Sequence, residues 1–75
     1  MNYVKESFTY KITFIGGKEL LIEGHKGIVS YSEQEIIARV KRGKLEIAGE
    51  KLFLKEINED ELLISGNVLG VRVIK

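Results

Sequence analysis

The sequence predicts an all-β protein, a small antiparallel meander of about seven to eight short strands folded as a two-layer sandwich, a roll or a partly open barrel. Three observations favour this fold class. Apolar and polar residues alternate with period two along most of the chain, turn-forming residues recur at short intervals, and no proline interrupts a sheet. Seventy-five residues suffice for one domain. We therefore expect residues 1–75 to form a single domain, with 1–7 as a flexible or weakly ordered N-terminal segment.

The first strand is predicted over residues 8–14. Aromatic and β-branched residues there alternate with threonine and lysine, which places the aromatic side chains Phe8, Tyr10 and Phe14 on one face. The strand ends at Gly16-Gly17, a dipeptide that supplies the positive φ angles of a tight turn.

Further apolar runs predict the remaining strands. They cover residues 20–23, 28–31, 36–40, 45–47, 52–54, 62–64 and 69–73. The breaks between most of them have good turn chemistry, and they fall at residues 24–27, 49–51, 58–60 and 66–67.

A weak repeat of the form Leu-x-Ile-x-Gly occurs at residues 20–24, 45–49 and 62–66. Two apolar side chains on one face followed by a glycine are what a strand needs as it enters a sharp bend. The repeats begin 25 and then 17 residues apart, so they do not indicate a regular solenoid.

The segment of residues 32–42 is ambiguous. Ser32-Glu33-Gln34-Glu35 matches a helix capping box, and Gly43 could end a helix. Ile36, Ala38 and Val40 nevertheless alternate as in a strand. The pattern favours a strand and leaves a short helix open.

Little in the sequence indicates chemistry. The chain has no cysteine and one histidine, too few ligands for a zinc site built from nitrogen and sulfur. No serine lies in a nucleophile elbow, and no phosphate-binding glycine motif occurs. His25 lies in a glycine-flanked loop, where we expect an exposed or a capping side chain. We therefore expect no enzymatic activity, no catalytic residue, no metal and no cofactor.

Charge and hydropathy indicate a cytoplasmic protein. Twelve basic and 11 acidic residues leave a net charge of +1, which creates no general attraction for polyanions. No apolar run approaches the length of a transmembrane helix, and the first residues lack the apolar stretch of a signal peptide. We expect no direct insertion into a membrane.

One cluster of basic residues stands above this background. It consists of Arg39, Lys41, Arg42 and Lys44, with His25 as a further candidate. The cluster could contact an anion, a nucleic acid or a partner protein, or it could be a solvated, aggregation-resistant edge. Strand-borne single-strand binders also need aromatic side chains beside such a patch, and none lies within it. Nucleic-acid binding is therefore the less favoured reading.

Several apolar residues alternate away from the predicted core. Ile37, Phe53, Leu63 and Ile74 could be buried in a two-layer fold or could form a contact surface. A meander with unguarded edge strands could also associate with itself, because β-augmentation needs only free backbone groups.

The order of motifs resembles the YabP/YqfC family of bacterial spore-formation proteins, and more closely its YqfC branch. The resemblance covers about residues 10–74 and rests on matched order rather than on one diagnostic motif. The matching segments are Ile12–Gly16, Leu21–Glu23, His25–Val29, Tyr31-Ser32, Glu35-Ile36, Gly43–Gly49, Leu52–Lys55, Glu61–Gly66 and Gly70-Val71.

The resemblance implies a protein of endospore formation, made in the mother cell, with no assigned catalytic residue or cofactor. It also implies a cytoplasmic module that acts with a membrane-embedded sporulation protein. The first hypothesis is therefore a non-enzymatic protein-interaction module. The second, from another class, is a domain that binds a small ligand, an anion or a nucleic acid through the loop of residues 24–27 and the basic segment of residues 39–44.

Overall fold

The computed structural model describes residues 10–16 and 18–75, and in this part the chain forms six strands and no helix. The all-β prediction is confirmed. The strands are β1 (Lys11–Ile15), β2 (Glu19–Glu23), β3 (Ile28–Tyr31), β4 (Glu35–Val40), β5 (Gly43–Ile57) and β6 (Glu61–Ile74). Three predicted features lie outside the described residues: the start of the first strand at 8–9, the turn residue Gly17 and the N-terminal segment 1–7.

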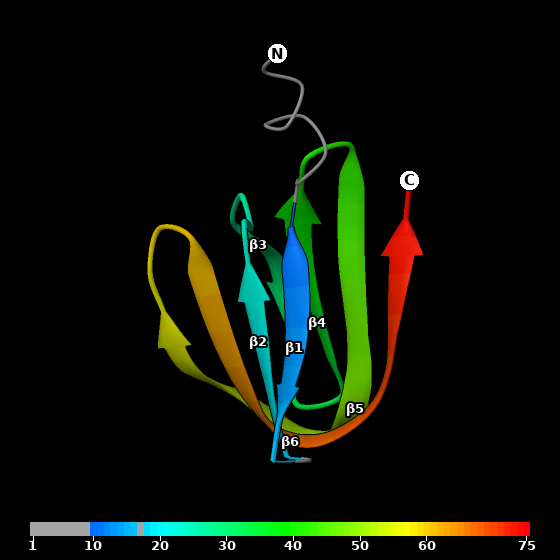
Figure 1. Cartoon of the computed structure of the whole chain (residues 1–75). Coiled ribbons are helices and arrows are strands. Elements are labelled where there is room, and N and C mark those ends of the chain that lie inside the picture. The colour runs from blue at the N-terminus through cyan, green and yellow to red at the C-terminus, as the bar shows by residue number, and fades with distance from the viewer. Residues whose placement is uncertain (1–9, 17) are drawn as a thin grey trace.

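The six strands form one antiparallel sheet in the order β1-β2-β6-β5-β4-β3. The two long strands, β5 and β6, bend together at the bottom of Figure 1, so that the two halves of the sheet face each other. One half holds β1, β2, the first part of β6 and the last part of β5. The other half holds the last part of β6, the first part of β5, β4 and β3. The predicted two layers therefore come from a single folded sheet.

The strand count is slightly lower than predicted because two predicted breaks are bends within continuous strands. Residues 45–47 and 52–54 both belong to β5, and residues 62–64 and 69–73 both belong to β6. The register between β5 and β6 shifts near these positions, at Ala48/Gly49 and between Glu50 and Phe53. Such β-bulges let a strand pair bend strongly without reversing direction.

Two glycines allow β5 and β6 to approach closely at the bend. A Cβ atom on Gly49 would lie 2.2 Å from the carbonyl oxygen of Asn67. A Cβ atom on Gly66, whose φ is +123°, would lie 2.5 Å from the carbonyl oxygen of Lys51. These glycines end the second and third Leu-x-Ile-x-Gly repeats, and the expected link between the repeat and a sharp bend is confirmed.

The core lies between the two halves of the folded sheet. All six leucines and isoleucines of the three repeats are fully buried: Leu20, Ile22, Leu45, Ile47, Leu62 and Ile64. Four more side chains complete the buried cluster: Ile36, Ala38, Val40 and Leu52. The repeat thus marks the positions where each half of the sheet contributes to one core.

Residues 35–40 form a strand, as the alternation of Ile36, Ala38 and Val40 favoured, and the helical alternative is wrong. The Ser32 hydroxyl oxygen accepts hydrogen bonds from the backbone N–H groups of Gln34 and Glu35. This turn explains the apparent capping box, because serine makes the same local bonds before a strand as before a helix. The part of the chain that the structure describes contains no helix that could span a membrane.

Candidate interaction surface

His25 is the one buried polar side chain of the described core, with 6% of its surface exposed. Its Nε2 atom donates to the carbonyl oxygen of Asn58 at 2.8 Å, and its Nδ1 atom accepts from the N–H of Gly27 at 2.9 Å. The ring therefore ties the loop after β2 to the loop before β6. The predicted capping role is confirmed and the exposed alternative is wrong. Both ring nitrogens are already used within the fold.

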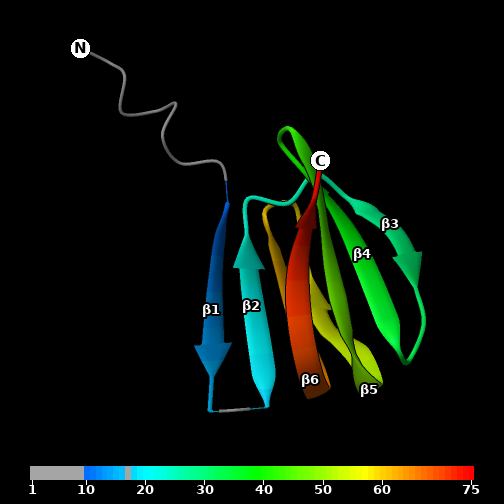
Figure 2. The same cartoon turned by 90° about the vertical axis from the view of Figure 1, so that its right-hand side faces the viewer.

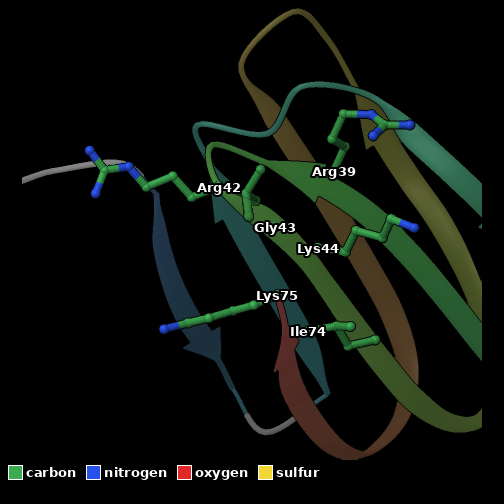
Figure 3. Close-up of a pocket in the computed structure, with 7 residues that line it drawn as sticks. Arg39, Arg42, Gly43, Lys44, Ile74 and Lys75 are labelled. Carbon is green, nitrogen blue, oxygen red and sulfur yellow. The ribbon is translucent and has the colours of Figure 1, made fainter.

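The basic segment lies around the turn between β4 and β5, which closes through the pair Val40 and Gly43. Figure 3 shows the side chains of Arg42 and Lys75 extending to one side of this turn, and those of Arg39 and Lys44 to the other. Arg39 and Lys44 are direct cross-strand partners. An open hollow of about 300 Å³ lies at this turn. The side chains of Arg39, Arg42 and Lys44, which line it, do not converge on one point (Figure 3).

Two other features of the described residues bear on ligand binding. A second hollow, of about 460 Å³, lies at the bend and is lined by Lys18, Glu50, Lys51, Ser65, Gly66 and Asn67. Neither hollow contains His25. Residues 10–16 and 18–75 hold no group of three or more histidine and acidic side chains arranged to bind a metal ion.

Among the described residues, two ion pairs join charged side chains of different strands. Arg72 of β6 donates a hydrogen bond to the carboxylate of Glu46 in β5. The Nζ atom of Lys55 lies 2.6 Å from Oε2 of Glu19. The pKa of Glu35 is raised because its carboxyl group hydrogen-bonds to Glu46, and the negative charge of Glu46 raises it further. The pKa of Glu46 is lowered because its carboxylate accepts hydrogen bonds from Glu35 and Arg72. A hydrogen bond to Glu19 raises the pKa of Lys55.

The apolar residues expected either in the core or on a contact surface have mixed positions. Ile37, Leu63 and Ile74 are half-buried, and Phe53 is 48% exposed. Other apolar side chains are more exposed than these four. Among them are Phe14, which is 61% exposed, and Leu69, which is 66% exposed.

The folded sheet has two lateral edges, and one of them is covered in part, where β5 runs past β4. At that edge the turn before β4 lies against β5, because the N–H of Leu52 donates to Glu33 and the N–H of Gly49 donates to Gln34. The N–H of Leu54 donates to the Tyr31 hydroxyl oxygen at 3.4 Å. These contacts satisfy backbone groups of β5 that no neighbouring strand reaches.

Within residues 10–16 and 18–75, no further strand pairs with the other edge, which is formed by β1 and the last part of β6 (Figures 1 and 2). Among strands, β1 contacts only β2. The N–H of Gly66 donates to the carbonyl oxygen of Lys18, and the N–H of Gly24 donates to the carbonyl oxygen of Asp60. Because backbone groups of a strand point to alternate sides, every second residue from Lys18 to Gly24 directs its N–H and C=O groups toward β6. The intervening residues, among them Leu21, turn theirs toward β1.

In β1, the backbone groups of every second residue bond to β2, and those of the residues between them do not. Lys11, Thr13 and Ile15 lie opposite Glu23, Leu21 and Glu19, and they exchange hydrogen bonds with them. Ile12 and Phe14 therefore point their N–H and C=O groups away from the sheet. Within the described part of the chain, no other backbone group bonds to them.

The side chains at the open edge are apolar on the inner face. Phe14 lies opposite the buried Leu20, so it points toward the core, yet it is 61% exposed. Val73 of β6 lies opposite the buried Leu45 and is 47% exposed. Unpaired backbone groups and exposed core-facing side chains therefore occur together at this edge, which is a template for pairing with another chain. We name this set, formed by β1 and residues 68–74 of β6, the open edge.

The sequence predicted unguarded edges but not which strand would be open. The inward direction of Phe14 followed from period two. Its exposure did not, because the exposure depends on β1 being the outermost strand and on the turn before β4 covering part of β5 at the opposite edge only.

A family model described as the YabP family matches residues 6–73 of the chain. The chain belongs to the YabP family. A relative from Bacillus subtilis (strain 168), named as the uncharacterized protein YqfC, is 32% identical over 65 residues, which cover 87% of this chain and 70% of the relative. The resemblance drawn from the sequence is therefore confirmed. No solved structure shows a significant match to the chain.

Proposed function

We propose that this chain is a non-enzymatic protein-interaction module of endospore formation, which acts in the mother-cell cytoplasm together with a membrane-associated partner. Membership of the YabP family supports the biological process, since the resemblance that pointed to this family implies a role in spore formation. The open edge supports the molecular part of the proposal.

The observation that carries the proposal is the coincidence of two features on β1. Its free side presents the backbone groups of Ile12 and Phe14, and its inner face leaves Phe14 61% exposed. An added strand would satisfy the backbone groups and cover the aromatic ring at the same time. Strand addition uses such an edge, with main-chain bonds for affinity and alternate side chains for specificity.

In the described residues of β1, the usual sequence features that protect an edge strand are largely missing. The chain has no proline, and the pairing of β1 with β2 contains no bulge. The described strand carries a single charged residue, Lys11, at its beginning. Natural sheets normally block an exposed edge with such devices unless the edge is used.

A complementation experiment tests the proposal. The gene is deleted from the host and replaced by the wild type, by Phe14→Lys or by Ile57→Lys, and heat-resistant spores are counted. Phe14→Lys places a charge at the open edge. Ile57→Lys is the matched control, because Ile57 is 55% exposed and lies opposite the buried Leu62 on a strand away from the open edge.

We expect the deletion to reduce the number of heat-resistant spores, and the wild type and Ile57→Lys to restore it. Phe14→Lys should not restore it, although the purified variant should remain folded by circular dichroism. A deletion strain that sporulates normally would refute the role in spore formation. Full complementation by Phe14→Lys would refute the role of the open edge.

A further inference from the structure

The free side of β1 is the most regular free strand edge in the described part of the chain. The free side of β6 is interrupted near Leu69, where the register with β5 shifts. β3 is short, and its pairing with β4 shifts between Ile28 and Ser30. The turn before β4 covers the free side of β5. β1 alone offers an unbulged row of backbone groups.

We propose that the occupant of this edge is β1 of a second copy of the chain, paired antiparallel about a twofold axis that passes beside Thr13. The inference rests on the proposed function, because it names the protein that binds at the open edge. The membrane-associated partner would then meet a dimer.

The backbone pattern of β1 fits this arrangement. Its free groups belong to Ile12 and Phe14, one on each side of Thr13. In an antiparallel copy centred on Thr13, Ile12 of each chain lies opposite Phe14 of the other, and each such pair can exchange two hydrogen bonds. Thr13 is the midpoint of the strand Lys11–Ile15, so this register pairs the strand over its whole length.

The side chains are also self-complementary in this register. On the outer face Thr13 meets Thr13, a favourable cross-strand pair, and Lys11 meets Ile15 without bringing like charges together. On the inner face Ile12 meets Phe14, so an exposed aromatic ring packs against an aliphatic side chain. A twofold axis perpendicular to the sheet keeps both inner faces on the same side, and the interface closes on itself as a dimer.

The residue on the twofold axis gives a sharp test, because it meets its own copy. Thr13→Glu places two carboxylates opposite each other, and Thr13→Lys places two ammonium groups opposite each other. An equimolar mixture of the two variants places unlike charges opposite each other. Ser65→Lys is the control, because Ser65 lies on the outer face of the same half of the sheet but away from its edge.

Light scattering coupled to size-exclusion chromatography, over a concentration series, measures the dimer. We expect the wild type and Ser65→Lys to reach twice the chain mass of 8.5 kDa. Each Thr13 variant should dissociate at least about fivefold more readily, and the mixture should regain the wild-type affinity. A wild type that stays monomeric at every concentration would overturn the inference, as would a mixture no tighter than its components.

A cross-link tests the register separately. The chain has no natural cysteine, so Thr13→Cys introduces a single thiol on the axis. Directly opposed residues that share no hydrogen bonds have Cα atoms about 4.5 Å apart, within the range of a disulfide. Mild oxidation should convert Thr13→Cys to a covalent dimer much faster than Ser65→Cys, and equal rates would contradict the register.

The two proposals can fail separately. If Phe14→Lys cannot support sporulation but the purified chain is monomeric and Thr13→Cys does not cross-link, the edge binds a different protein and only the dimer is wrong. If the dimer forms but sporulation does not need the chain, the proposed function is wrong.

Discussion

The bend in β5 and β6 gives the most quantitative prediction. Its Gly66 combines a positive φ with a close backbone neighbour, and two glycines elsewhere in the chain allow these two features to be tested separately. Gly66 has a φ of +123°, and a Cβ atom there would lie 2.5 Å from the carbonyl oxygen of Lys51. Gly27 has the same φ of +123° but nothing within 4 Å of the added atom. Gly70 has neither a positive φ nor a close neighbour. Replacing each by alanine separates backbone strain from steric clash.

The expected losses follow from these differences. A side chain at a strongly positive φ costs about 1–3 kcal/mol of unfolding free energy, so this is the loss for Gly27→Ala. Gly66→Ala adds the forced separation of two backbones, about 1–3 kcal/mol more. Gly70→Ala should be neutral, or stabilising by up to about 1 kcal/mol. A domain of this size has about 4–11 kcal/mol in total, so Gly66→Ala removes a large share of the stability.

Urea unfolding followed by circular dichroism, at one fixed protein concentration, measures these losses. We expect the order Gly70→Ala, Gly27→Ala, Gly66→Ala from most to least stable. The last two should differ by at least about 1 kcal/mol, or roughly 4–8 °C in Tm. Equal losses for Gly27→Ala and Gly66→Ala would show that the close approach of β5 and β6 does not restrict the residue at position 66.

Three further predictions concern single side chains. His25→Ala should lower the unfolding free energy by about 2–4 kcal/mol, because it removes a buried ring and leaves the carbonyl of Asn58 and the N–H of Gly27 unpaired. A loss below about 1 kcal/mol in urea unfolding would show that the hydrogen bonds of His25 do not hold the two loops together. Glu35→Gln should raise Tm at pH 7, because it removes the repulsion between the ionised carboxylates of Glu35 and Glu46. This gain in Tm should shrink as the pH falls through the raised pKa of Glu35, where the native carboxyl group takes up its proton. A gain in Tm that does not depend on pH would contradict repulsion between Glu35 and Glu46 as its cause. Lys44→Glu should stabilise the fold by up to about 1 kcal/mol, because it replaces a like-charged cross-strand pair with Arg39 by an oppositely charged pair. This gain in stability should be smaller in 1 M salt, which screens the charges. An unchanged Tm at low salt would show that solvent already relieves the repulsion between Arg39 and Lys44.

The sequence was sufficient for the local structure and for the composition of the core. Period-two alternation identified the strands, and the Leu-x-Ile-x-Gly repeat identified six fully buried side chains. The alternation at residues 36–40 outweighed the capping box at Ser32. These inferences succeed because each depends on neighbouring residues, whose side chains share a face whatever the rest of the chain does.

The long-range arrangement could not be read in this way. Glycines at 49 and 66 have the same local chemistry whether a strand ends or only bends, and the difference depends on β5 and β6 staying paired through the bend. Likewise, β2 pairs with β6 across about forty residues of sequence, so nothing near β1 shows that its other side is free. The burial of His25 depends on the distant carbonyl of Asn58.

Co-expression tests most directly whether β1, at the open edge, pairs with β1 of a second copy during spore formation. A deletion strain receives Thr13→Glu, Thr13→Lys or both genes together at the same total expression, and heat-resistant spores are counted. We expect fewer spores with either variant alone and recovery toward the wild-type number when both are present. Equal counts in all three strains would contradict this pairing of β1 strands.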